Sequence, residues 1–408
     1  MKKLMIIAMM VLGTSSVFAK DSDALKAIMS AKTFVEAQNL VNSSLSQMQG
    51  NEEIAKAYNK LVDLALDKVN KEQAIIDKNM LNQQLKQGEQ QKYDTIGYYN
   101  AIYDAVQSGL ECEKYDIMPN LKGSIKPKFH KPNQDRLFNL RLQLINAGQD
   151  AGNKQMKDEA LKNFGMYVSS SASSLFTDVA NKPAYDQYLG EVARVATVYA
   201  YQDKKLDLAN QYCDIALQDT AKALHKEAIS LKSYLLTQGL SSKADSLKAV
   251  ETLKELYVKE NGDDQIFSIL SSMYSNMNNK TEMLNLINEK LQKDPNNFNA
   301  LAMKGQSEMN DGKWDDAIAS FKKASAANEK DALVLTYIGF CLNSKAAALN
   351  NAAEQQKLYT ESMGYLEKAR SNDPNREHAN WSYPLYQCYY TLYGANDSRT
   401  KALENMNK

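Results

Sequence analysis

The chain has 408 residues with 49 basic and 49 acidic side chains, so its formal net charge at neutral pH is zero. A balanced charge provides no overall field that would attract nucleic acid or an anionic membrane surface. The chain contains only 17 glycines and seven prolines, and its many straight-chain residues favour helix because they lose little rotamer freedom there. The composition therefore predicts an all-α fold and argues against nucleic-acid binding as the main activity.

The first 19 residues have the pattern of a secretion signal. Two lysines precede an apolar run over residues 4–13, and Ala19 stands where a signal peptidase would cut. A membrane anchor is the alternative, but a span needs about 20 apolar residues and this run is much shorter. The first cysteine, Cys112, lies too far on for a lipoprotein. We expect cleavage after Ala19 and a periplasmic or exported protein without a membrane span.

Residues 20–133 are expected to form an N-terminal helical region. Apolar residues at helical spacing occupy three segments, 33–47, 51–88 and 93–112. Three prolines and Gly123 then interrupt the pattern over residues 113–133, which predicts a loop. Four lysines of this loop could meet an anionic glycan or a lipid head group, although a solvated loop explains them more simply: Lys122, Lys126, Lys128 and Lys131.

Beyond residue 133, one spacing recurs along the chain. A residue, a second one four positions later and a third one three positions after that share one face of a helix. Six copies of this pattern are Ala160/Phe164/Tyr167, Ala209/Cys213/Ala216, Ala249/Leu253/Leu256, Met283/Ile287/Lys290, Ala317/Phe321/Ala324 and Ser362/Leu366/Ala369. The copies start at intervals of 49, 40, 34, 34 and 45 residues, which is a period of 34 with three insertions. The small residues Gly305 and Gly339 keep the same step and would let two helices approach closely.

This pattern resembles the tetratricopeptide repeat family. The best unit, residues 298–331, has the residues that the family pattern requires at Gly305, Gly312, Trp314, Ala317, Phe321 and Ala324. The resemblance implies a right-handed α-solenoid of helix–turn–helix repeats over residues 134–376. Residues 377–408 would form a capping helix and a polar tail. Two departures from the pattern are Lys290, where a small residue is usual, and Glu329, where the closing proline is usual.

Three tripeptides combine Asp, a Ser or Thr, and an apolar residue. They are similar to the O-glycosylation sites of exported proteins in Bacteroidota, where repeat proteins of this build are common. In that case Thr95, Thr220 and Ser246 would carry the sugar. Helix capping is the simpler explanation, because Asp, Ser and Thr side chains accept hydrogen bonds from the free amides at the start of a helix.

No pattern in the sequence indicates a catalytic, metal or cofactor site. The three histidines have no partner at a metal-binding or catalytic spacing, and the four cysteines form no CxxC motif. A bridge between Cys341 and Cys388 is possible if their helices are neighbours, but buried free thiols are favoured. We therefore expect a protein that is not an enzyme, although a site assembled between the N-terminal helices and the repeats stays open.

The C-terminal segment places four tyrosines on one helical face, at Tyr383, Tyr386, Tyr390 and Tyr393. Such a stripe could stack on sugars. We expect it to pack against the preceding repeat instead, because the last helix of an array must bury one face. An exposed stripe together with an exposed Trp381 would favour a glycan ligand.

In tetratricopeptide repeat proteins, the first helices of successive units line a concave groove. When the positions of this chain are matched to the family pattern repeat by repeat, the exposed wall would include Gln265, Ser268, Ser272, Asn276, Asn299, Gln306, Asn310, Thr336 and Asn343, with Ser344 beside them. Amides and hydroxyls both donate and accept hydrogen bonds, so the wall suits an extended peptide backbone or a sugar. The leading hypothesis is a non-catalytic exported scaffold that binds a protein or peptide. The alternative is a glycan-binding module that supports nutrient uptake at the outer membrane.

Overall fold

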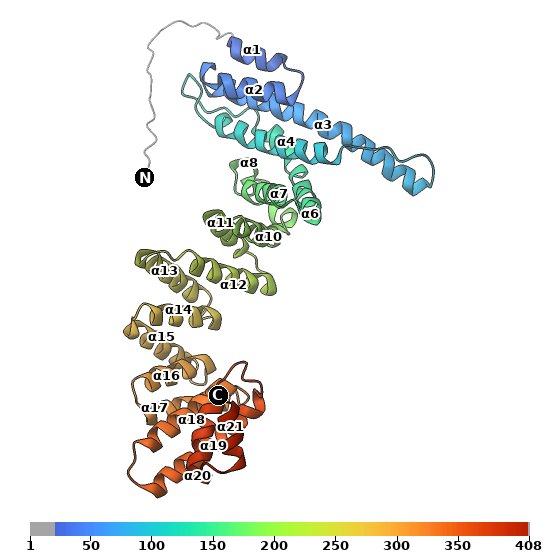
Figure 1. Cartoon of the computed structure of the whole chain (residues 1–408). Helices are drawn as coiled ribbons and strands as arrows, with labels where there is room; N and C mark the ends of the chain where they lie inside the picture. Colours follow the sequence, from blue (N-terminus) through green and yellow to red (C-terminus); the bar gives the residue numbers. More distant parts are fainter. Residues whose placement is uncertain (1–20, 407–408) are drawn as a thin grey trace. The chain divides into compact units, whose positions relative to one another are not determined.

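The computed structural model describes residues 21–406, and this part of the chain consists of helices and connecting loops without a β-strand (Figure 1). The expected all-α fold is confirmed. The predicted cleavage after Ala19 lies outside the described residues. Among the helices that are described, none combines the length and the apolar character needed to cross a membrane.

The chain divides into two compact units, one ending at Leu235 and the other starting at Leu236. The division falls inside α12 (Lys222–Gln238), within the expected array. Each unit has its own buried core, and the two are described separately below.

The N-terminal unit begins with four helices that match the three expected segments and add one more. They are α1 (Asp23–Ser30), α2 (Phe34–Ser44), α3 (Asn51–Leu85) and α4 (Thr95–Asp116), with a short 3-10 turn η1 (Leu45–Gln47) after α2. Helices α3 and α4 form a long hairpin, in which the C-terminal part of α3 extends beyond the start of α4 (Figure 1). Asp94 caps α4 by accepting a hydrogen bond from the Gly97 amide at 2.8 Å.

The rest of this unit is built from shorter helix pairs. They comprise α5 (His130–Leu137), the 3-10 turn η2 (Leu140–Leu142), α6 (Gln143–Asn153), α7 (Lys157–Ser170), α8 (Ser174–Thr177), α9 (Lys182–Tyr185), α10 (Leu189–Gln202) and α11 (Leu206–Ala216). Helix α6 packs on α7, and α10 packs on α11. The loop expected at 113–133 is shorter than predicted, because α4 continues to Asp116 and α5 begins at His130.

The C-terminal unit shows the repeat period directly. It contains α13 (Lys243–Lys259), α14 (Asp264–Asn276), α15 (Lys280–Lys293), α16 (Phe298–Asn310), α17 (Trp314–Ala327), α18 (Ala332–Ala347), α19 (Ala352–Asn372), α20 (Ser382–Tyr393) and α21 (Ser398–Met406). The first helices of three successive pairs, α14, α16 and α18, start 34 residues apart. The polar tail after α20 forms a further helix, α21, which packs against α20.

Residues that follow the recurring four-plus-three spacing form contacts between paired helices. Ala317, Phe321 and Ala324 of α17 are all fully buried, and the side chain of Phe321 lies against Gly305 of α16. A Cβ atom at Gly305 would come within 2.8 Å of the Phe321 ring. Gly339 of α18 meets Leu366 in the same way. The expected close approach of the paired helices is therefore confirmed.

Lys290, which departs from the repeat pattern, is accommodated by its length. Its aliphatic stem is buried, and its ammonium group reaches Asp264 at the start of α14, with 2.7 Å between Nζ and Oδ1. The same ammonium group lies 5.9 Å from the centre of the Phe267 ring. The long side chain thus places its charge at the edge of the helix pair, where it finds a carboxylate.

Candidate functional site

A polar groove lies between α14 and α16 in the C-terminal unit, with a volume of about 540 Å³. Ser272 and Asn276 of α14 line it together with Gln306 and Asn310 of α16, and all four side chains are exposed. These are four of the nine residues assigned to the wall from the sequence. They meet because residues 34 positions apart occupy equivalent points on successive first helices.

The groove is almost uncharged. Lys280 is the one charged side chain among the described residues that line it, and this lysine forms an ion pair with Asp311. The hydrogen bond from Lys280 lowers the pKa of the Asp311 carboxyl. Ser275, Met283 and Met303 also line the groove. The comparison of equivalent repeat positions in the sequence did not predict these three residues. The two methionines add a flexible apolar surface to a wall of hydroxyls and amides.

Three predicted wall residues lie outside the groove. Gln265, Ser268 and Asn299 are half-buried near the starts of α14 and α16. The Ser268 hydroxyl donates to the Asp264 carbonyl oxygen at 2.9 Å, within its own helix. The groove therefore uses the C-terminal halves of α14 and α16.

The prediction that Thr336 and Asn343 are exposed is wrong. Thr336 is 6% exposed, and its hydroxyl donates to the Ala332 carbonyl oxygen one turn earlier. Asn343 is 4% exposed because α20 covers it, and its amide donates to the Pro384 carbonyl oxygen. Ser344 is half-buried. The polar wall therefore does not continue along α18.

The tyrosine stripe of α20 is more exposed than predicted. Tyr383, Tyr390 and Tyr393 are 56%, 51% and 43% exposed, whereas Tyr386 is partly buried against the core. Trp381 is fully buried, and its indole nitrogen donates to the Asp373 carbonyl oxygen at 2.7 Å. The two observations point in opposite directions, because Tyr383 and Tyr390 are exposed whereas Trp381 is not. The ring of Tyr393 is covered by the Arg399 guanidinium, 3.8 Å from its centre.

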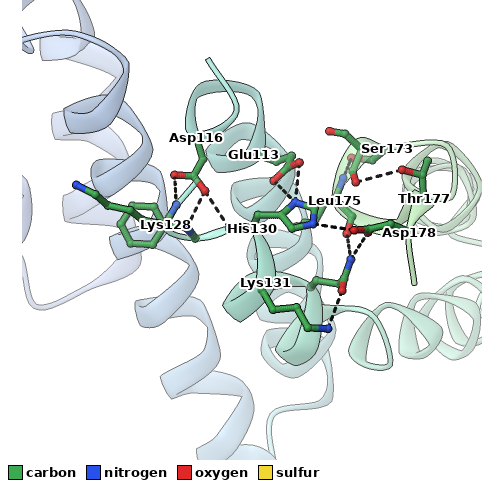
Figure 2. Close-up of polar contacts among 12 residues, drawn as sticks. Glu113, Asp116, Lys128, His130, Lys131, Ser173, Leu175, Thr177 and Asp178 are labelled. Carbon is green, nitrogen blue, oxygen red and sulfur yellow. Dashed lines mark hydrogen bonds and ion pairs between the residues drawn. The ribbon is translucent and has the colours of Figure 1, made fainter. Parts of the chain in front are cut away.

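The proline-containing loop is tied to α4 through Asp116 (Figure 2). The Asp116 carboxylate accepts hydrogen bonds from the backbone amides of Lys128, Phe129 and His130, at 2.7 to 2.9 Å. Two of the four loop lysines are engaged in ion pairs, Lys128 with Glu52 and Lys131 with Asp135. Lys128 and Lys131 are therefore held by two different carboxylates.

His130 lies between two carboxylates (Figure 2). Its Nδ1 is 2.9 Å from Glu113 Oε1, and its Nε2 is 3.4 Å from Asp178 Oδ2. Burial would lower the pKa of His130, but the hydrogen bonds and charges of Glu113 and Asp178 outweigh it and raise that pKa above 6.5. Glu113 is itself almost completely buried. The cluster fastens the start of α5 to α4 and to the end of α8.

The Asp-Ser/Thr tripeptides lie at or near helix starts. Thr95 directly follows the cap residue Asp94, and Thr220 is exposed just before α12. Ser246 lies one turn inside α13. The residue that caps this helix is Ser242, and the Ser242 hydroxyl donates to the Asp245 carboxylate at 2.8 Å. The Asp245 backbone amide in turn donates to the Ser242 hydroxyl oxygen at 3.2 Å, so the two side chains together cap the first turn of α13. Capping thus accounts for Asp94 and Asp245, and glycosylation of the three hydroxyls stays a prediction.

The four cysteines are free and buried, including Cys341 and Cys388. The Cys388 thiol donates to Asn343 Oδ1 at 3.2 Å, and burial raises its pKa to about 11. Burial also raises the pKa of Cys341, to about 12. Within residues 21–406, no cluster of three or more His, Cys, Asp and Glu side chains is placed to hold a metal ion.

Comparisons with known proteins yield structural similarity only. No family model matches the chain, and no curated protein matches it. Among solved structures, the MamA protein is 16% identical, covers 47% of this chain and 94% of its own, and has a TM-score of 0.33. The TPR domain of P58(IPK) is 15% identical with coverages of 92% and 97% and a TM-score of 0.21. The APC/C hetero-tetramer Cut9–Hcn1 is 11% identical with coverages of 94% and 88% and a TM-score of 0.23. At such low TM-scores, the repeat assignment rests on the helix pairs of this chain alone.

Proposed function

We propose that the protein is a non-catalytic scaffold that binds an extended segment of a protein partner in the groove between α14 and α16. The observation that supports this is the lining of the groove, where exposed hydroxyls and amides from two helices face a space of about 540 Å³. An extended peptide presents alternating N–H and C=O groups along its backbone. Asn and Gln side chains can satisfy both kinds of group, because each has a donor and an acceptor.

The low charge of the groove favours a partner segment that is itself nearly neutral. Lys280 is held by Asp311, so it provides little net attraction for a carboxylate terminus. Met283 and Met303 can adapt to apolar side chains of different shapes. We therefore expect recognition through the peptide backbone and a few apolar side chains, with little dependence on ionic strength.

We also propose that the scaffold acts outside the cytoplasm. The lysines, apolar run and Ala19 of the first 19 residues support this proposal, as a secretion signal would leave a mature chain starting at Lys20. The intact mass of protein recovered from the periplasm tests it. A retained N-terminus or a lipid adduct would contradict it.

The binding test begins with affinity capture of partners from the native cell envelope, using the mature chain as bait. The captured partner is then titrated against the variant Asn276→Ala/Asn310→Ala. Each lost amide leaves a buried polar group of the partner unpaired, at about 1–3 kcal/mol, so affinity should fall at least about tenfold. The fall should be similar at low and high salt.

The matched control replaces two exposed amides of α15 that lie outside the groove, Asn285→Ala/Asn288→Ala. This control removes the same chemical groups from the same unit and should bind as the parent does. If the groove variant and the control bind equally well, the partner does not occupy the groove. A binding loss confined to high salt would instead direct attention to the loop lysines 122–131.

A further inference from the structure

A second pocket, of about 770 Å³, lies in the N-terminal unit between α6 and α10. Its apolar part is formed by Ile145 of α6, Phe164 of α7, and Val192 and Val195 of α10. The end of α9 and the loop that joins it to α10 also line the pocket. The pocket is built entirely from residues 142–195, so it is independent of the groove between α14 and α16.

Two tyrosines border the pocket at the ends of residues 185–188, here called the tyrosine loop: Tyr185 ends α9, and Tyr188 immediately precedes α10. Tyr185 and Tyr188 are 47% and 51% exposed, so part of each side chain faces solvent beside the apolar surface. Tyr185 is held in place by Phe138, whose ring meets it edge-on with 5.7 Å between the ring centres. Both tyrosine rings are thus accessible to a ligand without a conformational change.

A buried ion pair anchors the tyrosine loop. Asp186, between the two tyrosines, accepts two hydrogen bonds from the Arg141 guanidinium at 2.8 and 2.9 Å. Arg141 is completely buried, and its guanidinium lies within 4.8 to 5.5 Å of the ring centres of Phe138, Tyr167 and Phe176. Such a planar, two-point contact fixes direction as well as distance. The tyrosines are therefore held in place before any ligand arrives.

The polar side chains of the pocket are mainly amides. Gln143, Asn146 and Gln149 stand three residues apart along α6, and Gln187 lies between the two tyrosines. Asn146 donates to Gln143 Oε1 at 2.8 Å, which orients both side chains. Glu191 is the one charged residue among the described residues that line the pocket. Without a lysine or an arginine, the lining does not suit a phosphate or a carboxylate.

We propose that this pocket binds a neutral oligosaccharide. A sugar ring presents an apolar face of C–H groups, which stacks on tyrosine, and a rim of hydroxyls that both donate and accept hydrogen bonds. Asn and Gln match such a rim because they also do both. A purely apolar ligand would displace water from these amides without offering them hydrogen bonds. A cationic peptide side chain would find only Glu191 to balance its charge.

The test uses isothermal titration of the mature chain with a panel of neutral oligosaccharides at millimolar concentration. The panel contains linear hexamers of α-linked and β-linked glucose, xylose, mannose and N-acetylglucosamine. At least one of them should bind, and Tyr185→Ala/Tyr188→Ala should weaken that binding at least about tenfold, which corresponds to about 1.4 kcal/mol. Tyr188→Phe should bind much as the parent does, because the stacking ring is kept.

The control is Tyr93→Ala, which removes an exposed tyrosine outside the pocket in the same unit and should leave sugar binding unchanged. Circular dichroism and the melting temperature verify that all variants are folded. Binding of none of the sugars, or binding that the double variant retains, overturns the proposal. So does binding of a hexa-arginine peptide that is lost in Glu191→Gln. Because the pocket and the groove are in different units, failure here leaves the peptide-binding proposal untouched.

Discussion

The side-chain amide of Asn343 in α18 donates a hydrogen bond to the backbone carbonyl oxygen of Pro384 in α20, at 2.9 Å. The same nitrogen lies 3.2 Å from Gln387 Oε1, and the Asn343 oxygen accepts from the Cys388 thiol. Asn343 therefore joins α18, the first helix of the last repeat pair, to the capping helix α20. It belongs to the packing of the unit and not to the groove between α14 and α16.

We predict that Asn343→Ala destabilises the protein by about 1–3 kcal/mol, because buried groups on α20 lose their hydrogen-bond partner. Asn310→Ala, which truncates an exposed amide, should change the free energy of unfolding by only about 0.5 kcal/mol or less. Urea denaturation of the two variants measures the difference. Equal stabilities would mean that Asn343 is not a structural link.

The position of Asn343 explains why the sequence alone misplaced it. The residue 34 positions after Asn310 is Ser344, so Asn343 is one residue out of register with the exposed amides of α14 and α16. One residue along a helix is a rotation of about 100°, which turns a side chain from the open face toward a neighbouring helix. Thr336 corresponds by the same count to Ala302, which is also partly buried. The repeat period predicts which face of a helix a side chain occupies only when the compared positions are 34 residues apart.

Contacts inside a helix pair were predictable, because they depend on spacing within one repeat. Gly305 and Phe321 illustrate this, since both belong to the same 34-residue unit. The His130 cluster was not predictable, because Glu113 and Asp178 lie 17 and 48 residues away and follow no period. The pocket beside Tyr185 was missed for a related reason. Its loop belongs to an insertion between repeats, where the period gives no information.

The close approach of α16 and α17 leads to a prediction for two glycines. Gly305→Ala should cost about 1–3 kcal/mol, because its new methyl group would overlap the Phe321 ring in a fully packed core. Gly364 is also helical, in α19, but a Cβ atom there meets nothing within 4 Å. Gly364→Ala should therefore stabilise the protein by up to about 1 kcal/mol, through helix propensity alone. Thermal unfolding of both variants gives the comparison, and a shift of the same sign in both would contradict the packing account.

The contribution of Asp104 in α4 to the free energy of unfolding should be lower at neutral pH than at acid pH. Burial raises the pKa of its carboxyl from 3.8 to about 6, although the charge of Lys162 opposes this. The folded protein then holds the proton more tightly than the unfolded chain, so stability falls as the pH rises from about 4 to about 6. At pH 7 both states are ionised and the folded state bears the full cost of burying the charge.

We therefore expect Asp104→Asn to raise the free energy of unfolding at pH 7 by about 1–2 kcal/mol, given about 1.4 kcal/mol per pKa unit and some screening by solvent. The gain should disappear below pH 4, where the parent carboxyl is protonated in both states. Asp67→Asn, at an exposed site of α3, is the control and should change little at either pH. A pH-independent gain would indicate that burial of charge is not the cause.

The last prediction concerns His130, whose pKa lies above 6.5 because Glu113 and Asp178 favour the imidazolium despite its burial. A group with a raised folded pKa stabilises the protein fully below its unfolded pKa, and this contribution is lost as the pH rises through the folded pKa. Stability should thus fall from about pH 6.5 upward, as the imidazolium loses its proton beside the buried Glu113 side chain. The pKa of the Asp178 carboxyl is lowered, so that group titrates at acid pH and does not contribute in this window.

The measurement is the free energy of unfolding of the parent, of His130→Gln and of His378→Gln between pH 6 and pH 9. His130→Gln should be less stable than the parent at pH 6 and should lack the fall above pH 6.5, so that the two curves converge as the pH rises. His378 is exposed, and its replacement should reproduce the parent curve. The start of α5 should also loosen in the parent at high pH, visible as lower amide protection factors near residues 128–130, after correction for the intrinsic exchange rate at each pH. If His130→Gln retains the full pH dependence, the titrating group lies elsewhere and the contact with Glu113 does not depend on the charge of the imidazole.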